Sequence, residues 1–171
     1  MEQVRSLIID LVLATDLASH FEHVDRVREL AAARGAAAAG ASSSGASTWT
    51  SPLATDEVDV PTLLSIAIKF ADLGHVLKTW EAHATWTARV TEEFWSLGDR
   101  ERAMGVPVGP LCDRHADTNV PKGQVGFFRF VCLPWYSAIA DLVDPAMAPY
   151  AQMQANLAAW EERARDSAPP E

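Results

Sequence analysis

The sequence predicts an all-α fold, and three observations support this prediction. Apolar residues recur at the helical spacing i, i+3, i+4 along most of the chain. No stretch shows the strict apolar–polar alternation of a half-buried β-strand. Proline and glycine stand where helices are expected to begin and end, as at Pro121 and Gly98. The chain has 171 residues and 49% hydrophobic content, which is enough for one core in a single domain or in a piece of a larger one.

Two helices and a change of composition are expected in the N-terminal part. The segment VRSLIIDLVLATDL, from Val4 to Leu17, is apolar on nearly every side, so we expect this helix to be buried. The second helix is amphipathic, with one apolar face made by Phe21, Val24, Val27 and Leu30. Ala31 to Pro52 is then rich in alanine, glycine and serine, which argues against one continuous helix. We therefore expect a flexible insertion at residues 31–60.

The helical pattern resumes at Pro61, runs to about Ala71 and pauses at Gly74. The next helix should end at Gly98 as its C-cap, and one of its faces carries His83, Trp86, Val90, Phe94 and Leu97. After a loop from Asp99 to Val120, Pro121 begins a long helix that Pro134 should kink. A last helix begins near Met147. Residues 1–145 would form part of one helical domain, and residues 146–171 a C-terminal helix with a disordered tail.

Charge and cysteine content exclude several classes of protein. The formal net charge of -9 repels nucleic acid and anionic membranes at long range. Cys112 and Cys132 form no CxxC pair, so neither a disulfide framework nor a zinc ribbon is indicated. No run of 18 uncharged apolar residues and no signal-peptide layout is present. These features predict a soluble cytoplasmic protein that neither binds nucleic acid nor spans a membrane.

Asp72 is the first candidate for a functional site. It closes the apolar run LLSIAIKFA, at a helix end where the macrodipole disfavours an acid. Solvent, a nearby base or a metal ion must offset this charge, and the local residues alone favour a solvated acid. His75, just beyond, is more typical of a helix-dipole partner than of a ligand. His20 and His23 have a chelating spacing but no third ligand nearby, so they are interpreted as a surface pair.

Gln124 is the second candidate, because its amide lies on an otherwise aromatic face with Phe127, Phe128 and Val131. A buried amide without a partner costs about 1–3 kcal/mol. A planar ligand that stacks on the aromatic ring and bonds edge-on to the amide would satisfy both groups, and a nucleobase is such a ligand. An amide bonded to a neighbouring helix explains the pattern equally well.

Four segments in the same order resemble one known family. They are LIIDLVLATDLASHF, AIKFADLGH, WTARVTEEFWSLGDRERAMGVPVGPLCDR and VPKGQVGFF, spread over roughly Val4 to Val143. They resemble the C-terminal half of the class I 3′,5′-cyclic nucleotide phosphodiesterase catalytic domain, with the Ala/Gly/Ser-rich insertion as an interruption. The resemblance implies a compact helical bundle around a pocket for two divalent metal ions, zinc and magnesium or manganese. It also implies hydrolysis of cAMP or cGMP to the 5′-monophosphate in signal transduction.

The resemblance assigns a role to nine residues. Asp72 corresponds to a metal-ligating aspartate, and Thr15 to a threonine that hydrogen-bonds water on the second ion. Gln124 corresponds to the purine-binding glutamine, and Phe127 to the aromatic ring that stacks on the base. The remaining positions correspond to the wall of the same pocket, with His75 near the base or ribose: His75, Leu17, Leu73, Val90 and Phe94.

The sequence departs from the family in one respect, because the HNxxH and HDxxH motifs are absent. Those motifs carry the other metal ligands and the general-acid histidine, so this chain has no candidate for the acid and is expected to be inactive alone. We interpret the chain as a fragment of an enzyme whose partner is its cyclic nucleotide substrate. The alternative is a noncatalytic helical module that binds a nucleotide or a protein. A homodimer is a further partner to consider.

Overall fold

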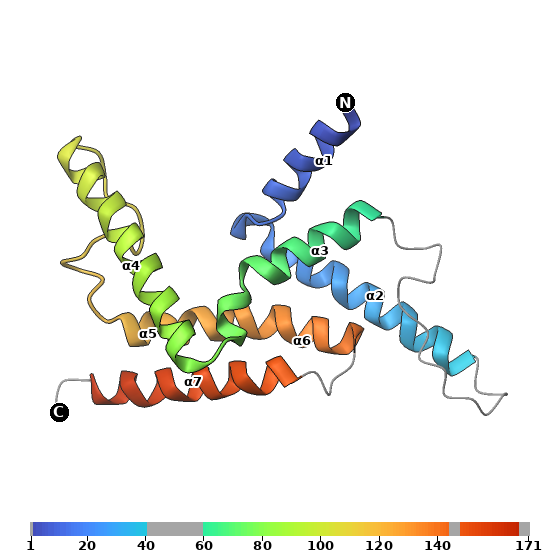
Figure 1. Ribbon diagram of the computed structural model, residues 1–171. Coiled ribbons are helices and arrows are strands. Elements are labelled where there is room, and N and C mark those ends of the chain that lie inside the picture. Colours follow the sequence, from blue (N-terminus) through green and yellow to red (C-terminus); the bar gives the residue numbers. More distant parts are fainter. Residues whose placement is uncertain (1, 41–59, 144–147, 168–171) are drawn as a thin grey trace. The chain divides into compact units, whose positions relative to one another are not determined.

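The computed structural model describes residues 2–40, 60–143 and 148–167, and within these ranges the regular structure is entirely helical (Figure 1). The all-α prediction is therefore confirmed. Contacts divide the chain into two compact units. The first contains Met1–Gly74 and Val131–Met147, and the second contains His75–Phe130 and Ala148–Glu171.

The first unit contains α1 (Glu2–Leu13), α2 (His20–Gly40), α3 (Val60–Asp72) and α6 (Leu133–Leu142). Helix α2 packs on α6, and α1 packs on α3. The Tyr136 hydroxyl of α6 donates a hydrogen bond to the Phe70 carbonyl of α3, at 3.0 Å. The core of this unit consists of apolar side chains from α2, α3 and α6: Val24, Val27, Ile66, Trp135, Tyr136, Ala138, Ile139 and Leu142.

Lys69 is a buried cation in this unit, and it bonds the backbone of the turn that follows α1. Its Nζ donates to the carbonyls of Ala14, at 3.1 Å, and Asp16, at 3.2 Å. Both carbonyls belong to the turn between α1 and α2, and the ammonium gives each of them a donor. Burial lowers the pKa of Lys69, and the negative charges of Asp72 and Asp16 oppose that shift. Lys69 thus ties α3 to the turn that follows α1.

The second unit contains the 3-10 turn η3 (Gly74–Leu77), α4 (Trp80–Ala103), α5 (Val120–Phe127) and α7 (Ala148–Asp166). Helix α5 packs on α7. Asn119 caps α5, because its side-chain oxygen accepts from the backbone N–H of Lys122 at 3.0 Å, and Pro121 stands in the first turn. Buried rings and one buried amide fill the space between α4, α5 and α7: His83, Phe128, Asn156 and Trp160.

One long helix, Val120–Leu142, contains α5, a π-helical segment η4 (Phe128–Cys132) and α6. The sequence predicted a kink at Pro134, and the irregularity takes the form of this π segment just before the proline. Among the described residues this helix is long and apolar enough to cross a membrane. The burial of Trp135, Tyr136 and Leu142 is also what a core helix of a folded protein shows.

Two predictions about the N-terminal helices were wrong. Helix α1 has no buried residue, and its apolar side chains are exposed, with Val12 at 61%. Helix α1 packs on α3, which covers only one side of it, so apolar side chains on the other sides are exposed. Helix α2 continues to Gly40, so the first ten residues of the predicted insertion are helical. Alanine is the strongest helix former, and it outweighs Gly35 in that stretch. Residues 41–59 of the predicted insertion lie outside the described residues.

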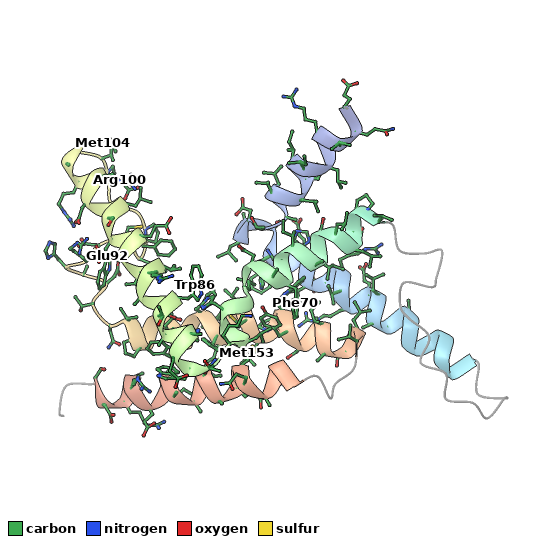
Figure 2. The ribbon with its side chains drawn as sticks, viewed as in Figure 1. Phe70, Trp86, Glu92, Arg100, Met104 and Met153 are labelled. Atoms are coloured by element: carbon green, nitrogen blue, oxygen red, sulfur yellow. The ribbon has the colours of Figure 1, made fainter. Side chains whose placement is uncertain are left out.

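The prediction for Gly98 was also wrong, because α4 continues past it to Ala103. A Cβ atom at Gly98 would overlap the Cys112 carbonyl of the loop that folds back along α4. The glycine therefore allows a close approach and does not end the helix. Arg114 holds the same loop against α4, since its guanidinium bonds Asp99, at 2.7 Å, and Glu92, at 3.0 Å. Figure 2 labels Glu92 on α4.

Candidate functional site

Four of the predicted site residues belong to the first unit. Asp72 is the last residue of α3, and its side chain is exposed. Thr15 follows α1, and its hydroxyl donates to the Val12 carbonyl at 2.8 Å, which leaves oxygen lone pairs to accept another hydrogen. Leu73 is buried, whereas Leu17 is half exposed, at 51%. Lys69 bonds the two carbonyls on either side of Thr15 and lies one turn before Asp72, so one side chain organises both positions.

The negative charge of Asp72 lies near the side chain of Lys69. The carboxylate acts electrostatically on the buried ammonium of Lys69 and favours its charged form. Of the three alternatives that the sequence left open, the structure therefore shows solvent exposure and a nearby base. A single exposed carboxylate has the right chemistry for one oxygen ligand of a hard divalent cation. No group of three or more potential metal ligands occurs among the described residues.

The interpretation of His20 and His23 as a surface pair was wrong for His20. Its ring is 2% exposed, and Nε2 donates to the Val131 carbonyl at 3.1 Å. Burial, followed by the charge of Lys69, lowers the pKa of both histidines. His20 is buried because the helix packing on α6 turns that side of α2 inward. Sequence spacing alone does not reveal which side of the helix is covered.

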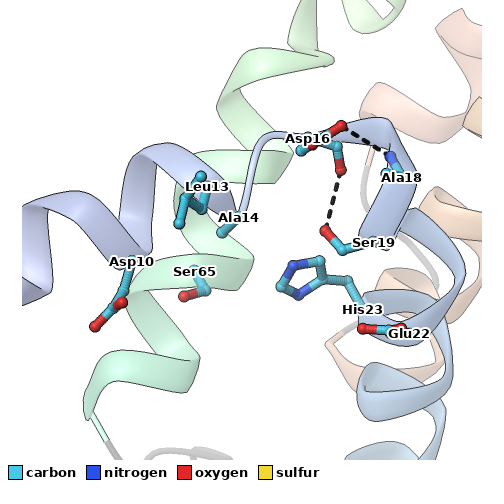
Figure 3. Close-up of a pocket in the computed structure, with 9 residues that line it drawn as sticks. All are labelled: Asp10, Leu13, Ala14, Asp16, Ala18, Ser19, Glu22, His23 and Ser65. Atoms are coloured by element: carbon cyan, nitrogen blue, oxygen red, sulfur yellow. Dashed lines mark hydrogen bonds between the residues drawn. The ribbon is translucent and has the colours of Figure 1, made fainter.

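A shallow hollow lies beside this part of the first unit (Figure 3). Asp16 stabilises the turn at one edge of the hollow. Its carboxylate accepts from the Ala18 backbone N–H, and its carbonyl accepts from the Ser19 hydroxyl. Its lining contains three carboxylates and one imidazole, from Asp10, Asp16, Glu22 and His23. Neither Asp72 nor Thr15 lines this hollow.

Five of the predicted site residues belong to the second unit. The Gln124 side-chain oxygen is buried and has no hydrogen-bond partner. Phe127 lies one helical turn later, and its ring stacks on His75 with the centroids 6.2 Å apart and the planes 13° from parallel. Val90 and Phe94 are exposed, at 37% and 40%, on the face of α4 that also carries Trp86 (Figure 2). The structure thus combines an unsatisfied amide, a stack of flat rings and exposed apolar side chains in one unit.

A chain of hydrogen bonds leads from α7 to His75, and sequence analysis did not identify it. Trp160 Nε1 donates to His83 Nε2 at 2.6 Å. His83 Nδ1 and His75 Nδ1 are 3.0 Å apart and share a hydrogen bond. Burial, with the nearby His75 as a second cause, lowers the pKa of His83 to about 4, so its ring is neutral near pH 7. The only sequence signal was a polar residue, His83, at the start of the apolar stripe on α4.

The second unit also holds the turn that carries His75. Asn156 of α7 is buried, and its Nδ2 donates to the carbonyls of Val76 and Lys78, both at 2.9 Å. Its Oδ1 accepts from Gln152 Nε2 at 3.1 Å, so all of the amide's polar atoms have partners. Helix α7 therefore fixes the backbone just after His75.

Comparisons with known proteins identify a family and several relatives. The family described as 3′5′-cyclic nucleotide phosphodiesterase matches residues 1–154. The human dual specificity calcium/calmodulin-dependent 3′,5′-cyclic nucleotide phosphodiesterase 1B is 32% identical over 149 residues, which is 87% of this chain and 24% of that protein. The human enzyme 1C is 31% identical over 147 residues, 86% of this chain and 18% of that protein. The chain thus spans about a quarter or less of these relatives' length.

Solved structures show the same fold. The crystal structure of the phosphodiesterase domain of Salpingoeca rosetta rhodopsin phosphodiesterase matches with a TM-score of 0.75 at 23% identity, over 96% of this chain and 46% of that chain. The structure of LmjPDEB1 in complex with IBMX matches with a TM-score of 0.74 at 29% identity, over 94% of this chain and 43% of that chain.

Proposed function

Because the chain belongs to the 3′,5′-cyclic nucleotide phosphodiesterase family, we propose that the complete protein hydrolyses a 3′,5′-cyclic nucleotide, cAMP or cGMP, to its 5′-monophosphate. The observation that carries this proposal is the buried, unpartnered oxygen of Gln124, one helical turn from the ring of Phe127. A purine would stack on the ring and supply a hydrogen to the amide oxygen, and both groups would then be satisfied.

The reaction breaks the bond between phosphorus and O3′, adds a water oxygen to phosphorus and returns a proton to O3′. Two divalent metal ions, zinc and magnesium or manganese, would supply an activated water and positive charge for the phosphate. In this chain, Asp72 offers one carboxylate ligand, and Thr15 offers a hydroxyl oxygen that accepts a hydrogen from water. Lys69 bonds the carbonyls on either side of Thr15 and lies one helical turn before Asp72.

In this proposal, one group of residues binds the base of the nucleotide and another residue binds a metal ion. In the second unit, Gln124 and Phe127 would hold the base, Val90 and Phe94 would add apolar contacts, and His75 would contact the base or the ribose. In the first unit, the exposed carboxylate of Asp72 would ligate a metal ion, and the resemblance assigns Leu17 and Leu73 to apolar contacts with the ligand. Residues 1–145 form part of this catalytic domain in the proposal, with the protein in the cytoplasm and acting in signal transduction.

Steady-state kinetics of the complete protein tests this division. Phe127→Ala and Gln124→Ala should each weaken substrate by about 1–3 kcal/mol, the usual worth of base stacking and of a buried hydrogen bond. Both should raise KM more than they lower kcat, whereas Asp72→Ala should mainly lower kcat and the metal content. The measurement is kcat and KM for cAMP and cGMP, with circular dichroism as the folding control. An unchanged KM in Gln124→Ala would show that this amide is structural.

The alternative function is a noncatalytic helical module that binds a nucleotide or a protein. It is favoured by the absence of HNxxH and HDxxH from the sequence and of a three-ligand cluster from the described residues. The 171-residue chain should then show no metal-dependent hydrolysis of cAMP or cGMP above a metal-free blank. Clear turnover by this chain alone would overturn the assignment of the missing ligands to another part of the protein.

A further inference from the structure

Two buried polar atoms at the packing of α2 on α6 in the first unit have no hydrogen-bond partner among the described residues. They are Nδ1 of the His20 ring and Nε1 of the Trp135 indole. His20 is the first residue of α2, Trp135 belongs to α6, and the two residues are 2% and 0% exposed. Their rings are neighbours, with the centroids 6.3 Å apart and the planes 52° from parallel. Both atoms therefore need a partner that lies inside the unit, because solvent does not reach them.

The bond that His20 makes to η4 decides which kind of partner its Nδ1 needs. A carbonyl oxygen only accepts, so Nε2 carries the hydrogen that bonds the Val131 carbonyl at 3.1 Å. A neutral imidazole has one ring hydrogen, so Nδ1 is left as an acceptor. Burial and the positive charge of Lys69 lower the pKa of His20, which keeps the ring neutral near pH 7. Nδ1 of His20 therefore needs a donor.

The Trp135 indole has the opposite need, because its N–H can only donate. The two groups are complementary, yet no hydrogen bond joins them directly. Native proteins commonly place an ordered water at such positions, since a buried donor or acceptor without a partner is costly. A water oxygen that makes two hydrogen bonds of about 2.9 Å each separates the joined atoms by roughly 5 Å. That span is comparable with the 6.3 Å between the two ring centroids.

The hydrogen-bonding needs of the two rings also select the ligand. It must donate a hydrogen to His20 Nδ1 and accept one from the Trp135 indole. An ammonium ion only donates and a halide ion only accepts, so each of these ions would leave one of the two atoms without a partner. A charged ligand would also lose its hydration between two neutral rings, which is unfavourable. Water is small and neutral, and it both donates and accepts.

We propose that one buried water molecule between α2 and α6 donates to His20 Nδ1 and accepts from Trp135 Nε1. Together with the bond from Nε2 to Val131, this water ties the first residue of α2 to η4 and α6. The short turn η1, Leu17–Ser19, ends at His20 and begins two residues after Thr15, so the water lies at the base of the turn that follows Thr15. The inference rests on the packing of the first unit and does not depend on the proposed function.

A high-resolution crystal structure of the chain and ¹⁵N NMR of its histidines test this proposal without any substitution. We expect one water within about 2.7–3.2 Å of both nitrogen atoms, and the ring hydrogen of His20 on Nε2 near neutral pH. A direct bond between the two rings, or an interface without water, would overturn the proposal. So would a neutral His20 ring with its hydrogen on Nδ1, because that nitrogen could not accept from water.

Substitution of His20 tests the water bridge in solution. Transfer of NMR magnetisation from water to the Trp135 indole hydrogen reports a water molecule held beside it. His20→Gln keeps an amide N–H that can reach the Val131 carbonyl, but glutamine has carbon where histidine has Nδ1. The transfer should therefore be lost while the circular dichroism spectrum stays unchanged.

His115→Gln, at an exposed histidine, is the matched control and should leave the transfer as it is. An equal transfer in His20→Gln, His115→Gln and the unsubstituted chain would overturn the role of Nδ1. The crystal structure of the unsubstituted chain decides whether the water is present even if His20→Gln does not fold.

Discussion

Acid should destabilise the second unit because His83 is buried in its neutral form. The His83 side chain has no exposed surface, and burial lowers its pKa from the model-peptide value of 6.5 to about 4. Protonation would place a charge among the rings of Trp80, Phe128 and Trp160 and would put a second hydrogen opposite the Trp160 N–H. The folded state therefore resists a proton that the unfolded chain accepts readily.

The sign and size of the effect follow from the two pKa values. Between pH 6.5 and about pH 4, unfolded His83 is protonated and folded His83 is not, so the unfolded state binds more protons and stability falls as the pH is lowered. The full loss of stability is about 3.4 kcal/mol at most, from about 2.5 pKa units at about 1.36 kcal/mol each. About 2 kcal/mol of it should appear between about pH 7 and about pH 5.

Urea titrations followed by circular dichroism at several pH values would measure this loss. His83→Gln removes the titrating group and should flatten the curve by about the amount given above, about 2 kcal/mol between about pH 7 and about pH 5. It should not remove all pH dependence, because His20 and His23 also have lowered pKa values of the same sign. His115→Gln, at an exposed histidine, is the matched control. If the His83→Gln and unsubstituted chains lose stability equally with acid, the reasoning about His83 is refuted.

Four further substitutions test the packing. Gly98→Ala should destabilise the chain by about 1–3 kcal/mol in urea titrations, because the new Cβ overlaps a backbone carbonyl. Gly123→Ala, in open space on α5, should instead stabilise it by up to about 1 kcal/mol, and the reverse order would contradict this account. Lys69→Met should cost about 1–3 kcal/mol, since the buried Ala14 carbonyl loses its donor and the Asp16 carbonyl keeps only the Ser19 hydroxyl, and no loss on calorimetry would count against that role. Asn119→Ala should lower helicity and cost about 1 kcal/mol as a lost N-cap, whereas an unchanged melting curve would not fit.

Local sequence patterns predicted the helices well and their surroundings less well. The starts near Pro61 and Pro121 were visible because proline and capping residues act within one turn. The continuation of α4 past Gly98 was not visible, since the reason is the loop carbonyl of Cys112, which approaches from a distant part of the sequence. The exposure of α1 was missed for a similar reason: an apolar helix predicts that something covers it, but not which segment.

Some residues of the candidate site were predicted and others were not, because the sequence shows local patterns but not contacts between distant segments. Gln124 stood out because an amide on an aromatic face conflicts with its own neighbours, and the structure leaves its oxygen unpartnered. Trp160 and His83 gave no comparable signal, because each is an ordinary residue on its own helix and they meet across 77 positions of sequence. The roles of Asp72 and Thr15 came from the resemblance and remain predictions.

The interleaving of the two units along the chain has a consequence for synthesis. The first unit needs α6, which follows Phe130, and the second needs α7, which follows Met147. A ribosome that has released residues up to Phe130 has therefore completed neither unit, although most of the helices are already outside. Until α7 emerges, Val76 and Lys78 lack the Asn156 amide and the Gln124 region lacks its packing partner. Because domains generally fold as units during synthesis, the second unit should remain open to chaperones and proteases until α7 is made.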